Sequence, residues 1–282
     1  MEEKLKIMAV VCHPADAIDH SGGTLCLHAE RGDDVTVVVC THGVDSHDLR
    51  RKAAIRKGES DHVAEKQDAI EAKEQEVIDG LAILGITDVR FLRFRDDLIV
   101  ANTEMVEAIA EQLADVQPHI LILHNPTEEI GFEHGETAIA ALRARNLAST
   151  DRFLKKPAGY AFPVQIYFNV MYGHTNQLAF EGMRFGGIVV DITPVVDRKV
   201  RAMDCLHSQY YPGPMGRKCI EATNGRMGLH LRISYAEAFQ PLHPHPYSHL
   251  PLNDRLMRQA RTPASETAGQ MRILVNDVPF EQ

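Results

Sequence analysis

The chain has 282 residues, of which 44% are hydrophobic and 24% charged, so it can form one large globular domain or two small ones. Its net charge of −9 argues against nucleic acid or an anionic membrane as a partner. The five cysteines form no CxxC pair, no apolar run is long enough to cross a bilayer, and the first residues lack the apolar core of a signal peptide. We therefore expect a cytoplasmic protein with reduced thiols.

The first apolar run, residues 7–11, predicts a buried parallel strand, and His13 and Asp16 follow at its carboxyl end. A helix over 23–31 and a second strand over 35–40 complete a β-α-β unit. Open α/β sheets bind ligands at the carboxyl ends of their strands, which makes His13 and Asp16 candidate site residues. The alternative is that the pair merely closes a turn and caps the helix.

A densely charged stretch, residues 44–66, follows the second strand and begins close to His42 and Asp45. We predict a long polar loop here, which is either solvated or a lid over the site. Helical periodicity then predicts a helix over 63–84 with Gly85 as its C-cap.

The following segments continue the alternation of strands and helices. We expect a strand over 89–92, a helix over 105–116, a strand over 119–124, a loop over 125–133 and a helix over 134–146. This alternation predicts an α/β fold, with a Rossmann-like doubly wound, mostly parallel sheet and helices on both faces. His124 ends a strand and His134 begins a helix, so both should lie near the crevice that receives His13.

The second half of the chain is less regular. Strands are expected over 163–170 and 187–192, and helices over 193–210 and 215–227, the first with Thr193 as N-cap. Beyond residue 240 the composition shifts to proline and histidine. We therefore predict one domain over 1–240 and an extended arm over 241–282 that contacts a neighbouring subunit of a homo-oligomer. His243, His245 and His249 favour an arm that contributes a histidine to a neighbour's site over a second metal site. The alternative is a disordered or surface-packed tail.

Two imidazoles and one carboxylate, with positions left for water, are a common catalytic set for Zn²⁺ or another divalent cation. The strand ends offer more candidates than such a set needs: His13, Asp16, His42, His124 and His134. Any one of these histidines alone would more often be structural.

Four motifs carry a resemblance to a known family: His13-Pro14-Ala15-Asp16-Ala17, Gly22-Gly23-Thr24, Gly131-Phe132-Glu133-His134 and Ala236-Glu237-Ala238-Phe239. The chain resembles the PIG-L/LmbE-like superfamily of zinc-dependent N-deacetylases. The resemblance implies that His13, Asp16 and His134 are the zinc ligands.

The departures from the family motifs bear on the reaction. Ala15 stands where the deacetylases carry their general base, Ala17 replaces a glutamate, and Gly131 replaces the first histidine of the second motif. Loss of one positioned acid or base costs about 10²- to 10⁴-fold in rate, so ordinary amide hydrolysis is not expected.

The 4-oxalomesaconate hydratase-like subgroup of the superfamily is similar in these departures. It implies a metal-dependent hydratase or lyase that adds or removes water at the C=C bond of a small oxo-carboxylate. The alternatives are an N-deacetylase or amidohydrolase with a relocated base, and a non-catalytic binding protein.

The missing acid or base must then come from elsewhere around the crevice. The candidates are His124, His42 and Asp45, each of which could instead orient a metal ligand through a hydrogen bond. A small-molecule carboxylate substrate needs cationic partners, and four arginines are candidates, although most surface arginines are simply solvated: Arg50, Arg51, Arg95 and Arg217.

Overall fold

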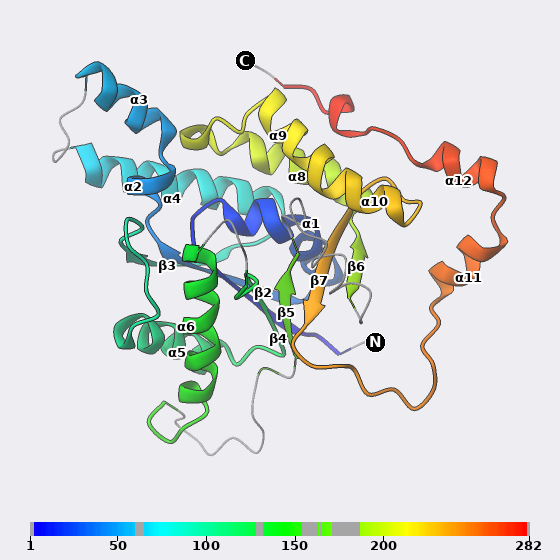
Figure 1. The fold of residues 1–282 in the computed structure, drawn as a ribbon, viewed down its shortest axis with the longest axis horizontal. Helices are drawn as coiled ribbons and strands as arrows, with labels where there is room; N and C mark the ends of the chain where they lie inside the picture. The colour runs from blue at the N-terminus through cyan, green and yellow to red at the C-terminus, as the bar shows by residue number, and fades with distance from the viewer. Residues whose placement is uncertain are drawn as a thin grey trace.

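The computed structural model describes residues 3–59, 65–127, 132–153, 163, 165–170 and 187–280. A seven-stranded sheet in the order β3-β2-β1-β4-β5-β7-β6 forms the centre of the fold (Figure 1). The strands are β1 (Lys6–Val11), β2 (Asp34–Thr41), β3 (Asp88–Phe94), β4 (Ile120–Leu123), β5 (Gln165–Asn169), β6 (Ile188–Asp191) and β7 (Ala236–Pro241). The first five are parallel, and β7 runs antiparallel to β5 and β6. The predicted mostly parallel α/β sheet is confirmed.

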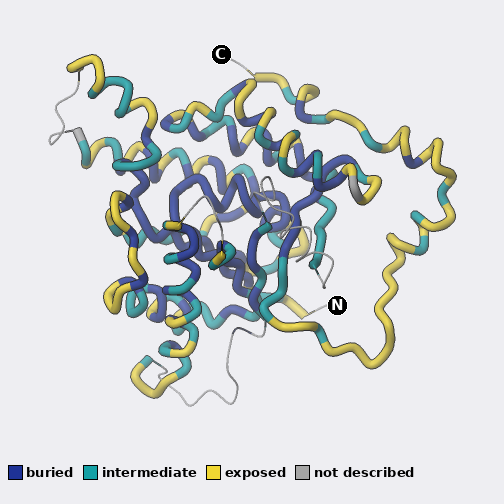
Figure 2. Tube along the Cα trace, in the orientation of Figure 1, coloured by how far each residue is buried: buried dark blue, intermediate teal, exposed yellow. Residues whose placement is uncertain are grey.

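Helices cover both faces of the sheet, because successive side chains of a buried strand point to opposite sides. Ile7, Ala9 and Val11 of β1 join one core cluster with α1 (Asp16–Arg31), α4 (Glu65–Ile83) and α8 (Val196–Asp204). Met8 and Val10 join a second cluster with α5 (Thr103–Val116) and α6 (Phe132–Ala148). The buried part of the chain accordingly lies at the centre of the molecule (Figure 2).

Two predictions in the first half were wrong. Helix α1 begins at Asp16, seven residues before the predicted start, and the predicted loop 44–66 contains α2 (Val44–His47) and α3 (Leu49–Lys57). The Asp48 side chain caps α3 by accepting a hydrogen bond from the Arg51 backbone N–H, and Gly58 ends it in a left-handed conformation. The charged composition reflects a solvent-facing helix, since no residue of α3 is buried.

The second half needs further corrections. Thr193 does not cap a helix, because its hydroxyl accepts a hydrogen bond from the Tyr235 backbone N–H at 3.1 Å. The helix predicted over 193–210 is divided into η1 (Thr193–Val195), α8 and η2 (His207–Gln209). That predicted over 215–227 consists of α9 (Pro214–Ile220), the π-helical turn η3 (Glu221–Gly225) and α10 (Arg226–His230). Strand β7 was not predicted.

A buried ion pair joins the two halves of the chain. Lys199 Nζ lies 2.8 Å from Glu237 Oε1, and neither side chain is more than 1% exposed. The Glu237 carboxylate also accepts from the backbone N–H groups of Gly23 (2.9 Å) and Thr24 (2.7 Å). Lys199 in turn donates to the backbone carbonyl of Asp19 at 2.7 Å. Side chains thus bind main-chain groups in the middle of α1.

The close packing of α1 around this ion pair also explains the glycine at position 23. A Cβ added there would lie 2.6 Å from Ile192 Cγ2, well inside van der Waals contact. The Gly-Gly-Thr and Ala-Glu-Ala-Phe motifs are therefore two sides of one packed contact. Since α1 begins at Asp16, the contact fixes the helix that carries a candidate metal ligand.

The C-terminal segment leaves the sheet after β7. Residues 242–253 have no regular secondary structure and are largely exposed, and α11 (Asp254–Arg261) and α12 (Ala264–Gln270) follow (Figures 1 and 2). The chain then returns through η4 (Val275–Asp277) to α8 and α9. His245 stacks on Tyr167 of β5 with ring centroids 5.8 Å apart. The domain boundary at residue 240 and the subunit contact remain predictions.

Membrane insertion through a helix finds no support in the described part of the chain, where no helix is both long and apolar enough to cross a bilayer.

The Lys199–Glu237 pair generates a stability prediction. Glu237→Ala leaves the Lys199 ammonium buried without its counter-charge and removes the carboxylate that binds two helix N–H groups. We expect it to lower the free energy of unfolding in urea by about 3–5 kcal/mol.

Asp197→Ala is the matched control, because it removes the partner of Arg201 from an ion pair whose two side chains are both 52% exposed. We expect a loss of less than about 1 kcal/mol from this change. Equal losses in the free energy of unfolding for the two substitutions would show that the buried pair contributes no more to stability than an exposed one.

Candidate metal centre

Three side chains implied as metal ligands by the sequence converge at the carboxyl end of β1. His13 Nδ1 lies 3.2 Å from His134 Nε2 and 3.4 Å from Asp16 Oδ2, and His134 Nε2 lies 3.5 Å from Asp16 Oδ2. All three residues are buried. The structure therefore brings His13, Asp16 and His134 together although 121 positions separate the two histidines.

The turn between β1 and α1 directs two of these side chains. The His13 backbone N–H donates to Asp16 Oδ2 at 2.7 Å, and the Asp16 backbone N–H donates to the His13 carbonyl at 3.2 Å. His134 lies in the first turn of α6. Burial raises the pKa of Asp16, but the charges of His134 and His13 and a hydrogen bond from His124 outweigh it and hold the pKa well below its usual range. Asp16 is therefore a carboxylate and a competent ligand.

The donor set fits a divalent cation. One ligand atom from each of His13, Asp16 and His134 lies within 4.8 Å of the others. Two imidazole nitrogens and a carboxylate oxygen are the donors that catalytic zinc takes when it keeps a position open.

His124 lies beneath this set and has no exposed surface. Its ring stacks on that of His134 with centroids 4.1 Å apart, and its Nε2 lies 3.2 Å from Asp16 Oδ2. The Cys12 backbone nitrogen lies 2.9 Å from the same ring nitrogen. This geometry favours orientation of Asp16 and His134 over proton exchange with a substrate.

His42 and Asp45 lie beside the metal centre in a second polar cluster. His42 Nδ1 lies 2.9 Å from Asp96 Oδ1, whereas Asp45 Oδ2 is 3.7 Å from His42 Nε2 and 2.8 Å from Lys66 Nζ. Burial raises the pKa of Asp96, but hydrogen bonds from His42 and Ser46 outweigh it and hold the pKa well below its usual range. The Asp96 carboxylate, not Asp45, is the anion that organises this cluster.

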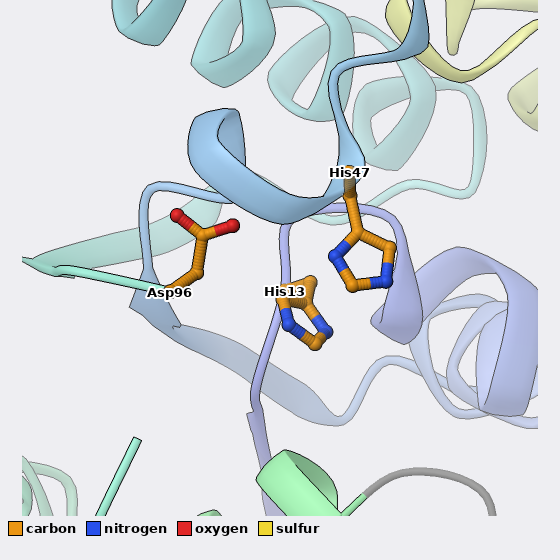
Figure 3. A group of neighbouring side chains, drawn as sticks. All are labelled: His13, His47 and Asp96. Atoms are coloured by element: carbon orange, nitrogen blue, oxygen red, sulfur yellow. The ribbon is translucent and has the colours of Figure 1, made fainter. Parts of the chain in front are cut away.

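His47 brings the two clusters together, and the sequence did not single it out. Its ring faces that of His13 beneath α2, with centroids 3.9 Å apart, and Asp96 lies beside the same helix (Figure 3). Burial, followed by the charge of His13, lowers the pKa of His47 to about 4. The ring is therefore neutral at neutral pH.

A chain of hydrogen bonds fixes the orientation of this ring. The Ser46 hydroxyl donates to Asp96 Oδ2, so its oxygen is left to accept from His47 Nδ1. The proton of the neutral ring then lies on Nδ1, and the lone pair lies on Nε2. Lys73, itself buried, donates to the His47 carbonyl at 3.3 Å and so fixes α2 from below.

A close approach packs α2 against the turn that carries His13 and Asp16. Gly43 precedes α2 with φ +64°, and a Cβ added there would lie 2.5 Å from Pro14 Cδ and 2.9 Å from Lys73 Cε. Only glycine combines this backbone conformation with this proximity.

A sequence signal existed for Asp96, because it follows β3 just as His13 follows β1 and His42 follows β2. No pattern marked His47, since the charged stretch around it gave no evidence of the helix that aims its ring.

The arginines predicted to bind substrate mostly have other partners. Arg95 is exposed and pairs with Asp97, and Arg217 donates to Asp204 (2.9 Å) and to the Val278 carbonyl (2.9 Å). Arg217 thus fastens the end of the chain to α9. Arg50 is exposed on α3 and Arg51 is half-buried on the same helix, next to α2. A role in substrate binding remains a prediction for all four.

Comparison with known proteins finds enzymes with two kinds of reaction. The sequence model of the family described as PIG-L, GlcNAc-PI de-N-acetylase, matches residues 8–144. A 4-oxalmesaconate hydratase of Pseudomonas putida is 25% identical over 254 residues, 84% of this chain and 89% of that protein. A 1D-myo-inositol 2-acetamido-2-deoxy-alpha-D-glucopyranoside deacetylase of Streptomyces avermitilis is 26% identical over 226 residues, with coverages of 69% and 74%.

The fold is also that of a solved hydratase. The crystal structure of the 4-carboxy-2-hydroxymuconate hydratase of Pseudomonas putida matches with a TM-score of 0.68 at 23% identity, over 88% of this chain and 100% of that one.

The convergent donor set generates a metal-binding prediction. Removal of a ligand in His134→Ala should weaken zinc binding by more than the roughly 10- to 100-fold that loss of an outer hydrogen-bond partner costs. Calorimetric titration of metal-stripped protein with zinc measures the effect. His207→Ala, at an exposed histidine of η2, is the control and should bind zinc like the unmodified protein. Equal affinity of the two variants would exclude His134 as a ligand.

Proposed function

This chain belongs to the PIG-L/LmbE superfamily, and we propose that it is a metal-dependent hydratase or related lyase acting at the C=C bond of a small oxo-carboxylate. The observation that carries the proposal is Ala15. It occupies the position at which the resembling deacetylases hold their general base, and it is buried at the N-cap of α1 with 2% exposure. The relative that aligns over 84% of this chain is a hydratase, which supports the same reaction class.

In this proposal His13, Asp16 and His134 hold zinc or another divalent cation. When bound, the cation supplies Lewis acidity that stabilises negative charge developing on a carbonyl or carboxylate oxygen of the substrate. The protein residues fix the position of the ligands, because His124 contacts Asp16 and His134 from beneath and orients both side chains.

The proton transfers are assigned to His47. Hydration of a C=C bond places OH on one carbon and H⁺ on its neighbour, so one group must take a proton from water and return one to carbon. Ser46 and Asp96 hold the His47 proton on Nδ1, which leaves the Nε2 lone pair to accept a proton. The Asp96 charge, relayed through Ser46, favours the imidazolium that then forms and offsets part of the effect of burial and of the His13 charge, which lower the pKa of His47 to about 4.

In this proposal the acid–base group lies on helix α2, whereas the resembling deacetylases carry theirs in the turn after the first strand. Of the earlier candidates, His124 is too deeply buried for contact with a substrate, and Asp45 is held by Lys66. His42 supports Asp96 at 2.9 Å and acts through it.

A carboxylate substrate is the other half of the proposal. Arg50 and Arg51 lie on α3, the helix that directly follows α2 in the sequence, and guanidinium groups suit planar carboxylates. A cytoplasmic location and a homo-oligomeric state belong to the same proposal.

The assignment of His47 predicts a loss of turnover. His47→Gln keeps a polar side chain but removes the exchangeable imidazole, so we expect kcat for hydration to fall by about 10²- to 10⁴-fold. Substrate dehydration or hydration can be followed by the ultraviolet absorbance of the conjugated C=C bond.

Ser46→Ala separates proton transfer from simple packing. It leaves the imidazole in place but removes the hydroxyl that holds the ring proton on Nδ1. We therefore expect a smaller loss in kcat than in His47→Gln, with little change in KM. Zinc affinity should stay unchanged in both variants. Full activity of His47→Gln with bound zinc would refute the assignment.

The second candidate function is N-deacetylation with a relocated base, because deacetylases are among the matched relatives. Ala15→Asp tests between the two. If the site is a hydratase site, restoring a carboxylate should create amide hydrolysis and abolish hydration, because the new anion lies at the metal-binding turn. Parallel assays of an N-acetylated sugar and an unsaturated oxo-carboxylate measure both. Strong deacetylase activity of the unmodified protein, merely increased in the variant, would favour the hydrolase.

A further inference from the structure

A cavity of about 240 Å³ lies between the end of α10 and the two helices of the C-terminal arm. Three arginines line it: Arg232 from the body of the protein, and Arg255 and Arg258 from α11. Among the described residues that line the cavity none is acidic. This concentration of positive charge stands out in a chain whose net charge is −9.

Two of these cations are not neutralised by a neighbour. Arg255 contacts Asp191. Across residues 3–59, 65–127, 132–153, 163, 165–170 and 187–280, the side chains of Arg232 and Arg258 make no ion pair. Their guanidinium groups are therefore available to an anion in the cavity.

Arg232 lies in the turn that ends α10 and lines the cavity from the body of the protein. Its φ is +58°, a left-handed conformation that glycine adopts far more readily than arginine. The Arg232 N–H donates to the Leu229 carbonyl, and the Ile233 N–H donates to the Gly228 carbonyl at 3.0 Å, so the turn is held in this state. These two hydrogen bonds are the ones that commonly end an α-helix, so they hold Arg232 at the wall of the cavity.

The walls of the cavity are fastened by hydrogen bonds between the body and the arm. Gln259 of α11 donates from Nε2 to the Leu231 carbonyl at 2.6 Å. Ser234 donates to the Gln270 carbonyl of α12 at 2.8 Å and accepts from the Arg272 N–H at 2.9 Å. The cavity is therefore a built feature of the fold, formed only when the arm lies against the body.

We propose that this cavity binds a phosphate-class oxyanion, which bridges Arg232 of the body to Arg258 of the arm. Guanidinium groups bind phosphate oxygens through paired, charge-assisted hydrogen bonds, and the volume suits a small anion better than a large cofactor. The site is separate in its residues from the metal centre, and binding there holds the arm in its docked position.

Calorimetric titration of the full-length, metal-loaded protein with inorganic phosphate at low ionic strength tests the proposal. We expect saturable binding, weakened by about 10-fold or more in Arg258→Gln and in Arg232→Gln, because each removes a charge-assisted hydrogen bond. Arg261→Gln, on the same helix but outside the cavity lining, is the matched control and should bind phosphate within about 2-fold of the unmodified protein.

Two further probes define the anion. Glycerol 3-phosphate that competes with phosphate identifies a free phosphate monoester as a ligand, and failure to compete restricts the site to inorganic phosphate. Succinate that binds as tightly as phosphate would overturn the phosphate class. No phosphate binding by the unmodified protein, or binding that survives both cavity substitutions, would overturn the site itself.

Amide hydrogen exchange supplies a readout of the arm. Phosphate should slow exchange over residues 254–270 in the unmodified protein and in Arg261→Gln, but not in Arg258→Gln. Equal exchange of the variants without phosphate shows that the arm is folded in each. A phosphate effect that persists in Arg258→Gln would contradict the bridging role.

Discussion

The contact between Lys199 and Glu237 is the interaction on which the arrangement of the protein depends. Side chains from α8 and β7 bind main-chain groups in the middle of α1, and both side chains are almost fully buried. Two charges removed from water are stable only when each is fully hydrogen-bonded, and here they are. Asn224 of the π-helical turn completes the set by accepting from Lys199 at 2.9 Å. Helix α1 is thereby locked in the position from which Asp16 faces the end of β1.

The candidate metal centre follows from the geometry of the parallel sheet. β1 lies between β2 and β4, so the residues that leave these three strands meet at one edge of the sheet. His13, His42 and His124 reach that edge from three strands, and His134 reaches it from the first turn of α6. The proposed acid–base group, His47, comes from a short helix that a glycine seats on the same edge. In the proposed reaction, a histidine from a different element takes the role of the carboxylate that is absent at Ala15.

The fold was largely predictable because its signals are local. Apolar runs of the length of a strand, alternating with helical periodicity, identify β1 to β4 without reference to distant residues. Prediction was wrong where local preference and tertiary packing disagree. Gly22 and Gly23 disfavour a helix, yet α1 continues through them, where Glu237 binds the backbone N–H groups of Gly23 and Thr24. The charged stretch 44–66 hid α2 and α3 because their stability rests on caps and on contacts with α4 and η2.

The sequence by itself determined the fold class, and the family motifs in it implied the three candidate ligands, because strand patterns and motifs are written in neighbouring residues. The tertiary structure alone decided what surrounds those ligands. It places the His47 ring against that of His13, brings Asp96 to both His42 and Ser46, and pairs Arg217 with Asp204 and the Val278 carbonyl, away from the ligands. These contacts join side chains from separate elements, such as Gly23 and Glu237, which are 214 positions apart. Only the packing of the helices on the sheet sets distances of that kind, and no local pattern records them.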